Sequence, residues 1–243
     1  MTGTGKTVSA GGASQAEIDA FLRRVAAAPA PQAVAGGRGR LMFAIDATAS
    51  RQPTWDRARQ LQREMFEVTA ALGGLDIQLV YFRGYGECKA SPWLADATDL
   101  GRRMAGVECL AGHTQWCRVL GHAATETRRG KVGALVCVGD ACEEEIDRLG
   151  DLAGQLGLLG VPAFCFHEGP DLQARLAFEQ VAKLTGGAYC PFDGASARQL
   201  RDLLSAVAVY AAGGLAALAD FGQARGGAAR VLTDRLAKPQ DKD

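Results

Sequence analysis

The sequence predicts a Rossmann-like α/β fold, in which a doubly wound, mostly parallel sheet is covered by helices on both faces. Two observations predict it. From Leu41 onward, short apolar runs alternate with segments of helical periodicity, and these segments are about 10 to 18 residues long. Such alternation is typical of parallel strands joined by helical crossovers. The chain has 243 residues, which is enough for one sizeable core, so we expect one domain with additional segments at its ends.

Each element follows from its own pattern. Strands are expected over residues 41–45, 77–82, 132–138, 161–166 and 188–190, where apolar residues run together. A short edge strand is expected within residues 87–93, because Pro92 would end it. Helices are expected over residues 54–72, 96–106, 115–128, 143–157 and 171–184, followed by a last helix from Ser196. The first of these helices has an apolar stripe from Trp55 to Leu72 and ends at Gly73.

The two ends of the chain differ in composition from the middle. Residues 1–36 begin with a Gly/Ser/Thr-rich segment and then carry a short helical pattern with Ser14 as its cap. A proline-containing stretch follows this helix, so we expect an appendage or docking arm outside the core domain. The core domain is expected over residues 37–212, and residues 213–243 are expected to form an Ala/Gly-rich extension with a disordered tail.

Charge and hydropathy argue against two classes of partner. Lys plus Arg and Asp plus Glu each total 27, so no basic excess favours nucleic acid. No window approaches ~18 consecutive apolar residues, and the first residues lack an apolar signal segment, so we expect a cytoplasmic protein without a membrane partner. The seven cysteines include no Cys-x-x-Cys pair. Cys137 and Cys165 lie within apolar runs, which indicates reduced core residues rather than a catalytic thiol.

A cluster of side-chain oxygens is predicted at the end of the first strand. Residues 41–55 read LMFAIDATASRQPTW, so the apolar run stops at Asp46 and hydroxyl groups follow at Thr48 and Ser50. Alternate residues just past a strand point roughly the same way, which turns these oxygens towards one small volume. Clustered oxygens suggest a hard cation. The alternative is that Asp46 and Ser50 only cap the helix near residue 54.

Two further oxygen-bearing side chains are expected at the same edge of the sheet. Thr114 lies at the entry of a predicted helix, and Asp140 ends a buried predicted strand. Open parallel sheets bind their ligands at the carboxyl ends of the strands, where both residues are expected to lie. Their presence favours metal binding over capping.

The order of these residues resembles the metal-ion-dependent adhesion site (MIDAS) of von Willebrand factor A (VWA) domains, over about residues 40–212. Three elements carry the resemblance. They are Asp-x-Thr-x-Ser after the first strand, a lone Thr ahead of a middle helix, and an Asp after a later strand. It implies that Thr48, Ser50 and Thr114 coordinate Mg²⁺, with Mn²⁺ as a substitute. It also implies that Asp46 and Asp140 act mostly through bound waters.

The resemblance also implies a function without catalysis. In the family, an acidic side chain of a partner protein completes the coordination of the metal. We therefore expect a non-enzymatic, Mg²⁺-dependent protein-interaction module with no catalytic residues. Intracellular bacterial members often work beside AAA+ ATPases or in stress and defence systems, so we expect a partner of that kind. The alternative is a metal-assisted hydrolase on a similar sheet, for which His113 is the sole candidate base.

Two positions depart from the pattern of the family. Thr48 stands where the family usually has Ser, so the oxygen is retained and a methyl group is added. Asp140 is followed by Ala141 rather than Gly, and then by Cys142 and three glutamates. We interpret these glutamates as offsetting the dipole of the helix that follows them.

Three other signals have ordinary explanations. Residues 5–7 read Gly-Lys-Thr but lack the upstream glycine and strand of a nucleotide-binding P-loop. His113, Cys117 and His122 do not combine with other residues at zinc-ligand spacing. Four aromatic residues are interpreted either as core residues or as the rim of the site, namely Trp55, Tyr85, Trp93 and Trp116.

Overall fold

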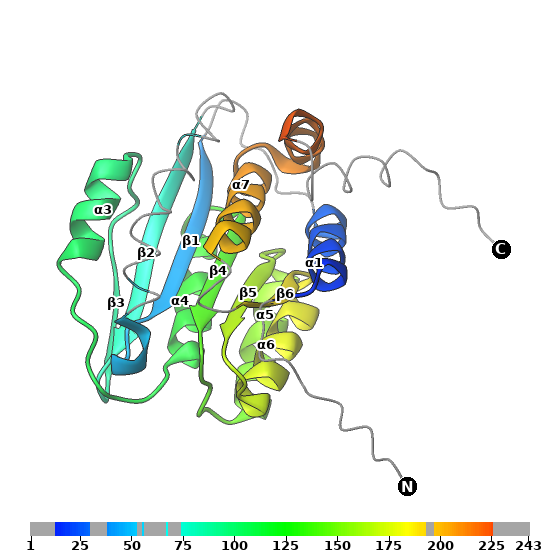
Figure 1. Cartoon of the computed structure of the whole chain (residues 1–243). Helices are drawn as coiled ribbons and strands as arrows, with labels where there is room; N and C mark the ends of the chain where they lie inside the picture. Colours follow the sequence, from blue (N-terminus) through cyan, green and yellow to red (C-terminus); the bar gives the residue numbers. More distant parts are fainter. Residues whose placement is uncertain are drawn as a thin grey trace, which may run out of the picture.

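The computed structural model describes residues 13–29, 38–52, 55, 67, 74–192 and 197–225. Its centre is a six-stranded sheet with the strand order β3-β2-β1-β4-β5-β6 (Figure 1). The strands are β1 (Gly39–Asp46), β2 (Leu75–Arg83), β3 (Glu87–Ala90), β4 (Ala134–Gly139), β5 (Ala163–Glu168) and β6 (Ala188–Phe192). β3 pairs with β2 in the antiparallel sense, and the other neighbouring strands are parallel. This sheet confirms the predicted fold class, including the short edge strand.

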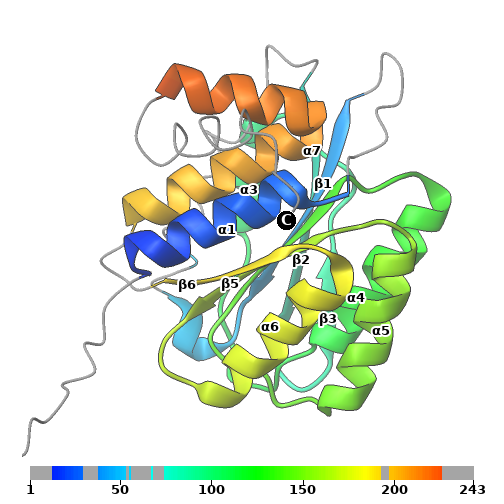
Figure 2. The same cartoon turned by 90° about the vertical axis from the view of Figure 1, so that its right-hand side faces the viewer.

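Helices cover both faces of the sheet. They are α1 (Gln15–Ala27), α3 (Ala97–Ala105), α4 (Trp116–Arg129), α5 (Ile146–Leu158), α6 (Leu172–Thr185) and α7 (Ala197–Arg225), with a short 3₁₀ helix η1 (Ala49–Arg51). Figure 2 shows α1 and α7 on one face and α4, α5 and α6 on the other. Two clusters of buried apolar side chains lie between the sheet and these layers. The chain therefore has a three-layer α/β/α architecture.

The sequence of β1 reflects this double burial. Leu41, Phe43 and Ile45 belong to the cluster under α1 and α7, whereas Met42 and Ala44 belong to the cluster under α4. Because both faces of a parallel strand are covered, its sequence is continuously apolar rather than alternating. Asp46, which ends β1, is fully buried with them. The strand therefore places the Asp46 carboxylate at the carboxyl edge of the sheet.

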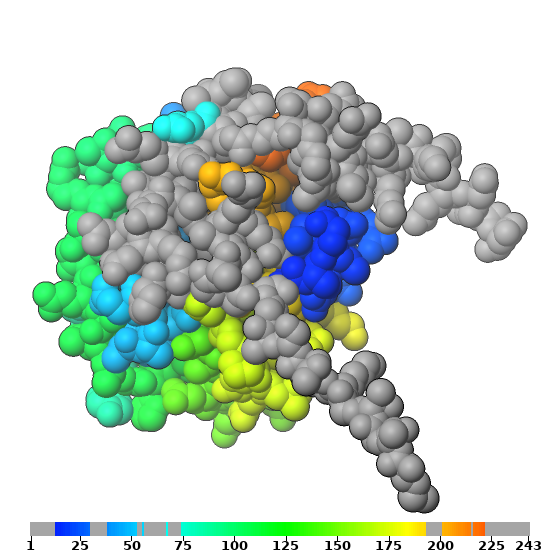
Figure 3. Space-filling view, viewed as in Figure 1, coloured from blue at the N-terminus to red at the C-terminus, as the bar shows by residue number. Residues whose placement is uncertain are grey.

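The interpretation of the N-terminal helix as an appendage is wrong. Ser14 caps α1 in a capping box with Glu17, as its pattern predicts, but Phe21 of this helix is almost fully buried. The Phe21 ring centroid lies 6.0 Å from that of Phe164 and 5.2 Å from that of Phe166, both on β5. The apolar stripe of α1 therefore completes the core above β5 and β6. Figure 3 shows α1, in blue, at the surface beside the orange helix α7.

The last helix continues beyond the predicted end of the core domain. α7 runs to Arg225 with a non-helical position at Gly214, where φ is +69°. Leu218, past this kink, is fully buried and belongs to the cluster that also contains Phe21. Part of the predicted 213–243 extension therefore packs on the core.

Several predictions lie outside the described residues. They are the Gly-Lys-Thr segment, the disordered tail and most of the predicted helix over residues 54–72. None of the helices among the described residues combines the length and the apolar character that a membrane span requires.

Candidate metal site

Four of the five predicted site residues line one pocket at the carboxyl edge of the sheet. The pocket has a volume of about 250 Å³, and its lining includes Thr48, Ser50, Thr114 and Asp140. The fifth residue, Asp46, is fully buried, and one of its carboxylate oxygens accepts the Thr48 backbone N–H at 2.7 Å. Segments separated by up to 94 positions in the sequence therefore meet here, because β1 and β4 are neighbours in the sheet.

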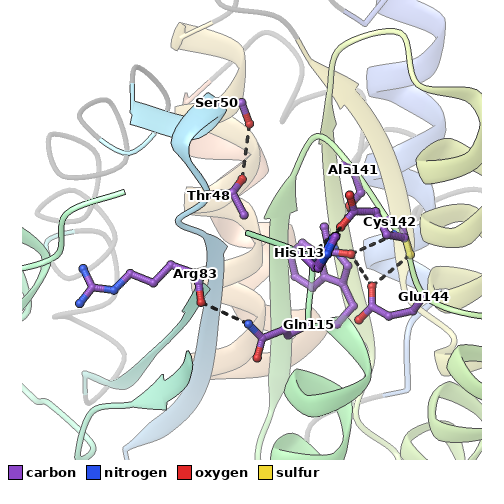
Figure 4. Close-up of polar contacts among 11 residues, drawn as sticks. Thr48, Ser50, Arg83, His113, Gln115, Ala141, Cys142 and Glu144 are labelled. Carbon is purple, nitrogen blue, oxygen red and sulfur yellow. Dashed lines mark hydrogen bonds and ion pairs between the residues drawn. The ribbon is translucent and has the colours of Figure 1, made fainter. Parts of the chain in front are cut away.

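The hydroxyl groups of Thr48 and Ser50 are oriented by their neighbours. The Ser50 hydroxyl donates to Asp140 Oδ2 at 2.9 Å. Its single proton is then committed, so the Thr48 hydroxyl proton has two acceptors within the protein, Ser50 Oγ at 3.4 Å and the Asp46 carboxylate. Figure 4 shows these two side chains next to each other on the same side of the site. Both hydroxyls direct their protons at the protein and keep lone pairs for the pocket.

The Thr114 hydroxyl group is oriented in the same way, with its proton directed at the protein. It donates to Glu144 Oε2 at 2.6 Å and accepts the Glu143 backbone N–H at 2.9 Å. A hydroxyl has one proton and two lone pairs, so Thr114 can offer the pocket only its remaining lone pair. The hydroxyls of Thr48, Ser50 and Thr114 are therefore all acceptors towards the pocket.

Two carboxylate oxygens at the site have unmet hydrogen-bonding capacity. Asp46 Oδ2 and Asp140 Oδ1 are buried, and neither has a hydrogen-bond partner within the described parts of the chain. Burial raises the pKa of Asp46 from 3.8 to about 6, although the hydrogen bonds from Thr48 oppose this rise. A buried carboxylate with an unsatisfied oxygen is unfavourable unless a positive charge compensates it.

The donor set fits a small, hard cation. Mg²⁺ prefers oxygen ligands and retains bound waters, so hydroxyl ligands with nearby carboxylates suit it. Among the described residues, no three His, Cys, Asp or Glu side chains are grouped so that they could hold a metal ion. The predicted set does not require such a group, because it contains two carboxylates and three hydroxyls. If bound, the ion would be held by Thr48, Ser50 and Thr114, with Asp46 and Asp140 compensating its charge.

The prediction for the glutamates that follow Cys142 is wrong in its target. The sequence predicts that they face the start of the next helix, α5, but two of them contact the start of α4 instead. Glu143 Oε2 accepts the Thr114 N–H at 2.9 Å, and Glu144 Oε1 accepts the Cys117 N–H at 3.0 Å. Only Glu145 stands at the N-cap of α5, and it makes no side-chain capping bond there. A single helix start does not need three consecutive glutamates. The length of this run is the signal in the sequence that some of them have another partner.

The Thr114 loop is also held from the side of the β2–β3 turn. The His113 N–H donates to the Gly84 carbonyl oxygen at 3.1 Å, and the Gln115 side chain donates to the Arg83 carbonyl oxygen at 3.3 Å (Figure 4). The backbones are so close that a Cβ atom on Gly112 would lie 2.0 Å from the Gly84 carbonyl oxygen. Contacts on both sides therefore fix the main chain at Thr114.

We predict that Gly112→Ala separates these two segments. The added methyl group cannot be accommodated against backbone atoms, so the free energy of unfolding should fall by roughly 1 to 3 kcal/mol. Mg²⁺ affinity should fall with it, because Thr114 is displaced. Gly86→Ala is the matched control, since its added Cβ meets no heavy atom within 4 Å. Chemical denaturation and calorimetry on both variants test the prediction, and equal stability of the two variants would contradict it.

A buried arginine next to the site was not anticipated from the sequence. The Arg51 side chain is only 2% exposed, and its Nη1 lies 2.7 Å from Glu168 Oε2 and 3.7 Å from Asp140 Oδ2. Arg51 immediately follows Ser50, and the turn of η1 carries its side chain inward between the ends of β4 and β5. This cation offsets the charges of Asp140, which lines the pocket, and of Glu168, and the apolar patterns of the sequence give no sign of it.

The four aromatic residues divide between core and surface. Trp55 and Trp116 are buried, and their indole N–H groups donate to the Met104 and Ala141 carbonyl oxygens. Trp93 donates to Glu126 on α4. Tyr85 is 82% exposed, and its ring centroid lies 5.1 Å from that of His113 beside the pocket. Tyr85 is therefore the most exposed of the four and lies next to His113.

The cysteines of the two central strands are buried, as predicted. Cys137 on β4 lies opposite Cys165 on β5 in the register of the sheet, and both side chains are almost fully excluded from solvent. A hydrogen bond with Cys137, together with burial, raises the pKa of the Cys165 thiol well above its ordinary value. These thiols behave as core residues.

Comparisons with known proteins identify the fold. No protein-family model and no curated protein matches the sequence. Among solved structures, a von Willebrand factor type A protein from Catenulispora acidiphila matches with a TM-score of 0.59 at 15% identity, covering 71% of this chain and 43% of that one. The SpRpn10 VWA domain matches with a TM-score of 0.54 at 14% identity, covering 69% of this chain and 94% of that domain.

A third match carries a metal. Proximal thread matrix protein 1 from the mussel byssus, in a structure with a zinc-occupied MIDAS motif, matches with a TM-score of 0.53 at 15% identity. The match covers 71% of this chain and 46% of that one, so this chain spans less than half of two of these three proteins. The strand order, the helices on both faces and these neighbours together show that the chain has a Rossmann-like α/β fold of the VWA type.

Proposed function

We propose that this chain is a Mg²⁺-dependent protein-interaction module that binds an acidic side chain of a partner protein through a metal in the pocket. One observation carries the proposal. The hydroxyl groups of Thr48, Ser50 and Thr114 all direct their protons away from the pocket, and two buried carboxylate oxygens beside them lack partners among the described residues. Hydroxyl and carboxylate oxygens that act as acceptors towards the pocket favour a cation over an anion.

A bound Mg²⁺ would supply an electrophilic position for an external carboxylate. The residues of this chain favour that use, because the proposed direct ligands are neutral hydroxyls and the carboxylates lie behind them. Arg51 neutralises part of the carboxylate charge of Asp140 and Glu168, which reduces repulsion of an incoming acidic group. Mn²⁺ should substitute for Mg²⁺, since it shares the preference for oxygen ligands.

The nature of the partner is part of the same proposal. The resemblance to intracellular bacterial VWA proteins supports an AAA+ ATPase or a component of a stress or defence system, in the cytoplasm. The zinc-occupied MIDAS of the mussel protein supports the use of this fold for a divalent ion. Tyr85 and His113, which are exposed beside the pocket, would contact the partner around its acidic residue.

A metal-assisted hydrolase is the second candidate, and one contact favours it. His113 Nδ1 lies 3.1 Å from Glu143 Oε2, which is the geometry of a base oriented by a carboxylate. Loss of ester hydrolysis in His113→Ala with retained metal affinity would support the enzyme. Absence of turnover in the wild-type chain, combined with metal-dependent partner binding, would support the interaction module.

We predict that Ser50→Ala weakens Mg²⁺ binding by about 10-fold or more, because it removes one ligand and the donor to Asp140. Isothermal titration calorimetry with Mg²⁺ and with Mn²⁺ measures the change. Thr125→Ala is the control, since it removes an exposed hydroxyl on α4 that bonds only a carbonyl oxygen of its own helix. Unchanged Mg²⁺ affinity in Ser50→Ala would refute the metal assignment.

The partner is tested separately by capture from native lysate with and without a chelator. Capture should require the divalent ion, should be lost in Ser50→Ala and should persist in Thr125→Ala. A partner that binds equally well in the presence of chelator would contradict the role of the metal.

A further inference from the structure

We propose that Glu144 is a positioning residue that sets the polarity of the Thr114 hydroxyl and thereby makes this oxygen a metal ligand. The inference rests on the proposed function, and it adds a residue outside the Asp-x-Thr-x-Ser, Thr and Asp pattern. Glu144 lies in the loop between β4 and α5, four residues after Asp140.

Both carboxylate oxygens of Glu144 are engaged by groups at the start of α4. Oε2 accepts the Thr114 hydroxyl at 2.6 Å, and Oε1 accepts the Cys117 N–H at 3.0 Å. The Cys142 thiol also lies 3.6 Å from Oε2 (Figure 4). The carboxylate is therefore oriented by two donors from α4 and its entry, and its negative charge lies at the positive end of that helix.

The consequence for Thr114 follows from the number of protons involved. The short hydrogen bond to a carboxylate fixes the hydroxyl proton on the side of Glu144. The Glu143 N–H uses one lone pair, which leaves one lone pair for the pocket that Thr114 lines. Donation to a carboxylate also makes the oxygen more electron-rich and hence a better ligand for a hard cation. Glu144 therefore determines that the oxygen lone pair of Thr114, and not its proton, faces the pocket.

Glutamine at this position would reverse that polarity while preserving the shape. Thr114 and Cys117 both present donors, so the residue between them must offer two acceptors, and glutamine offers one acceptor and one donor group. If the amide oxygen accepts from Cys117, the amide N–H₂ faces Thr114 Oγ1 and turns the hydroxyl proton towards the pocket. If the amide is flipped, its N–H₂ faces the Cys117 N–H and the helix start loses its acceptor.

We therefore predict that Glu144→Gln weakens Mg²⁺ binding by about 10-fold or more, as expected for loss of a group that orients a ligand. Glu145→Gln is the matched control, because it removes the same charge from an exposed residue one position away that makes no capping bond. Calorimetry should show nearly unchanged affinity in Glu145→Gln. Equal losses in the two variants would reduce the effect to net charge and overturn the proposal.

A double-mutant cycle with Thr114→Val tests whether Glu144 acts through Thr114. Valine keeps the shape of threonine and removes the oxygen. In the Thr114→Val background, Glu144→Gln should cause no further loss of Mg²⁺ affinity. Additive losses would overturn the proposal, and so would an unchanged affinity in Thr114→Val alone.

A metal-independent measurement separates this inference from the proposed function. In the metal-free wild-type chain, the Thr114 hydroxyl proton should be visible by NMR as a slowly exchanging signal, because it is buried and donates a short hydrogen bond. The signal should disappear in Glu144→Gln and persist in Glu145→Gln. A wild-type chain that binds no divalent ion would refute the proposed function while leaving this test intact. A wild-type Thr114 hydroxyl signal that is unchanged in Glu144→Gln would refute the role of Glu144 alone.

Discussion

Asp46→Asn is expected to weaken Mg²⁺ binding by about 10-fold or more and, at the same time, to stabilise the metal-free chain at neutral pH. The asparagine retains the acceptor for the Thr48 N–H and loses the negative charge. Asp46 is fully buried, and its Oδ2 has no hydrogen-bond partner within the described residues. In the proposed site, the charge would therefore favour the metal and disfavour the metal-free fold.

The size and sign of the stability effect follow from the pKa of Asp46. Burial raises this pKa from 3.8 to about 6, and such a rise corresponds to roughly 3 kcal/mol. In the metal-free chain, the folded state retains the Asp46 proton to higher pH than the unfolded state. The Asp46 contribution to the free energy of unfolding therefore falls as pH rises from about 4 to about 6, and the full penalty is present above that window.

Thermal and chemical denaturation of the metal-free proteins at pH 4 and pH 7 measure this effect. Asp46→Asn should be more stable than the wild type at pH 7 by roughly 1 to 3 kcal/mol, and the difference should shrink towards pH 4. Asp151→Asn, on the exposed side of α5, is the control and should change neither stability nor metal affinity. A destabilised Asp46→Asn at pH 7 would contradict the account of this carboxylate.

The second large effect is expected from Arg51→Met. Removing this cation leaves Glu168 and Asp140 without the positive charge between them, 2.7 and 3.7 Å away. Breaking a buried ion pair by removing one partner typically destabilises a protein by about 3 to 5 kcal/mol. We expect about 3 kcal/mol, because both carboxylates keep partial exposure.

Mg²⁺ should stabilise Arg51→Met more than it stabilises the wild type. The ion compensates Asp140 in place of the lost guanidinium, and a cation next to the pocket no longer opposes its binding. Thermal denaturation with and without Mg²⁺ tests this. Arg175→Met is the control, since Arg175 forms an exposed pair with Glu179 within α6 and should lose less than about 1 kcal/mol. Arg51→Met with the stability of the control would show that the buried pair contributes little.

The sheet could be predicted because its signal is local. The continuous apolar run of β1 ends at Asp46, and the apolar runs of β2, β4 and β5 likewise end close to their observed bounds. Strands buried on both faces must be apolar throughout, so each run identifies a strand without reference to the rest of the chain. The same rule places Asp46 at the edge of the sheet.

Features that depend on tertiary contacts could not be predicted in this way. The stripe on α1 shows that one face of the helix is buried but does not show that Phe21 packs against β5. Glu144 reaches from one loop to the start of α4, and nothing in its local sequence distinguishes that helix from α5. Arg51 is polar in sequence and buried in the fold, because its partners are Asp140, just after β4, and Glu168, at the end of β5.

The most direct test of the metal site is X-ray diffraction from crystals of the wild-type chain grown with Mn²⁺, with data collected to record the anomalous signal of manganese. The hydroxyl polarity and the two unpartnered carboxylate oxygens predict one anomalous peak per chain, in the pocket lined by Thr48, Ser50 and Thr114. At an Mn²⁺ concentration near the wild-type dissociation constant, the peak should be much weaker in crystals of Ser50→Ala. A wild-type pocket without anomalous density at saturating Mn²⁺, or equal peak heights in the wild type and Ser50→Ala at the lower concentration, would contradict the assignment.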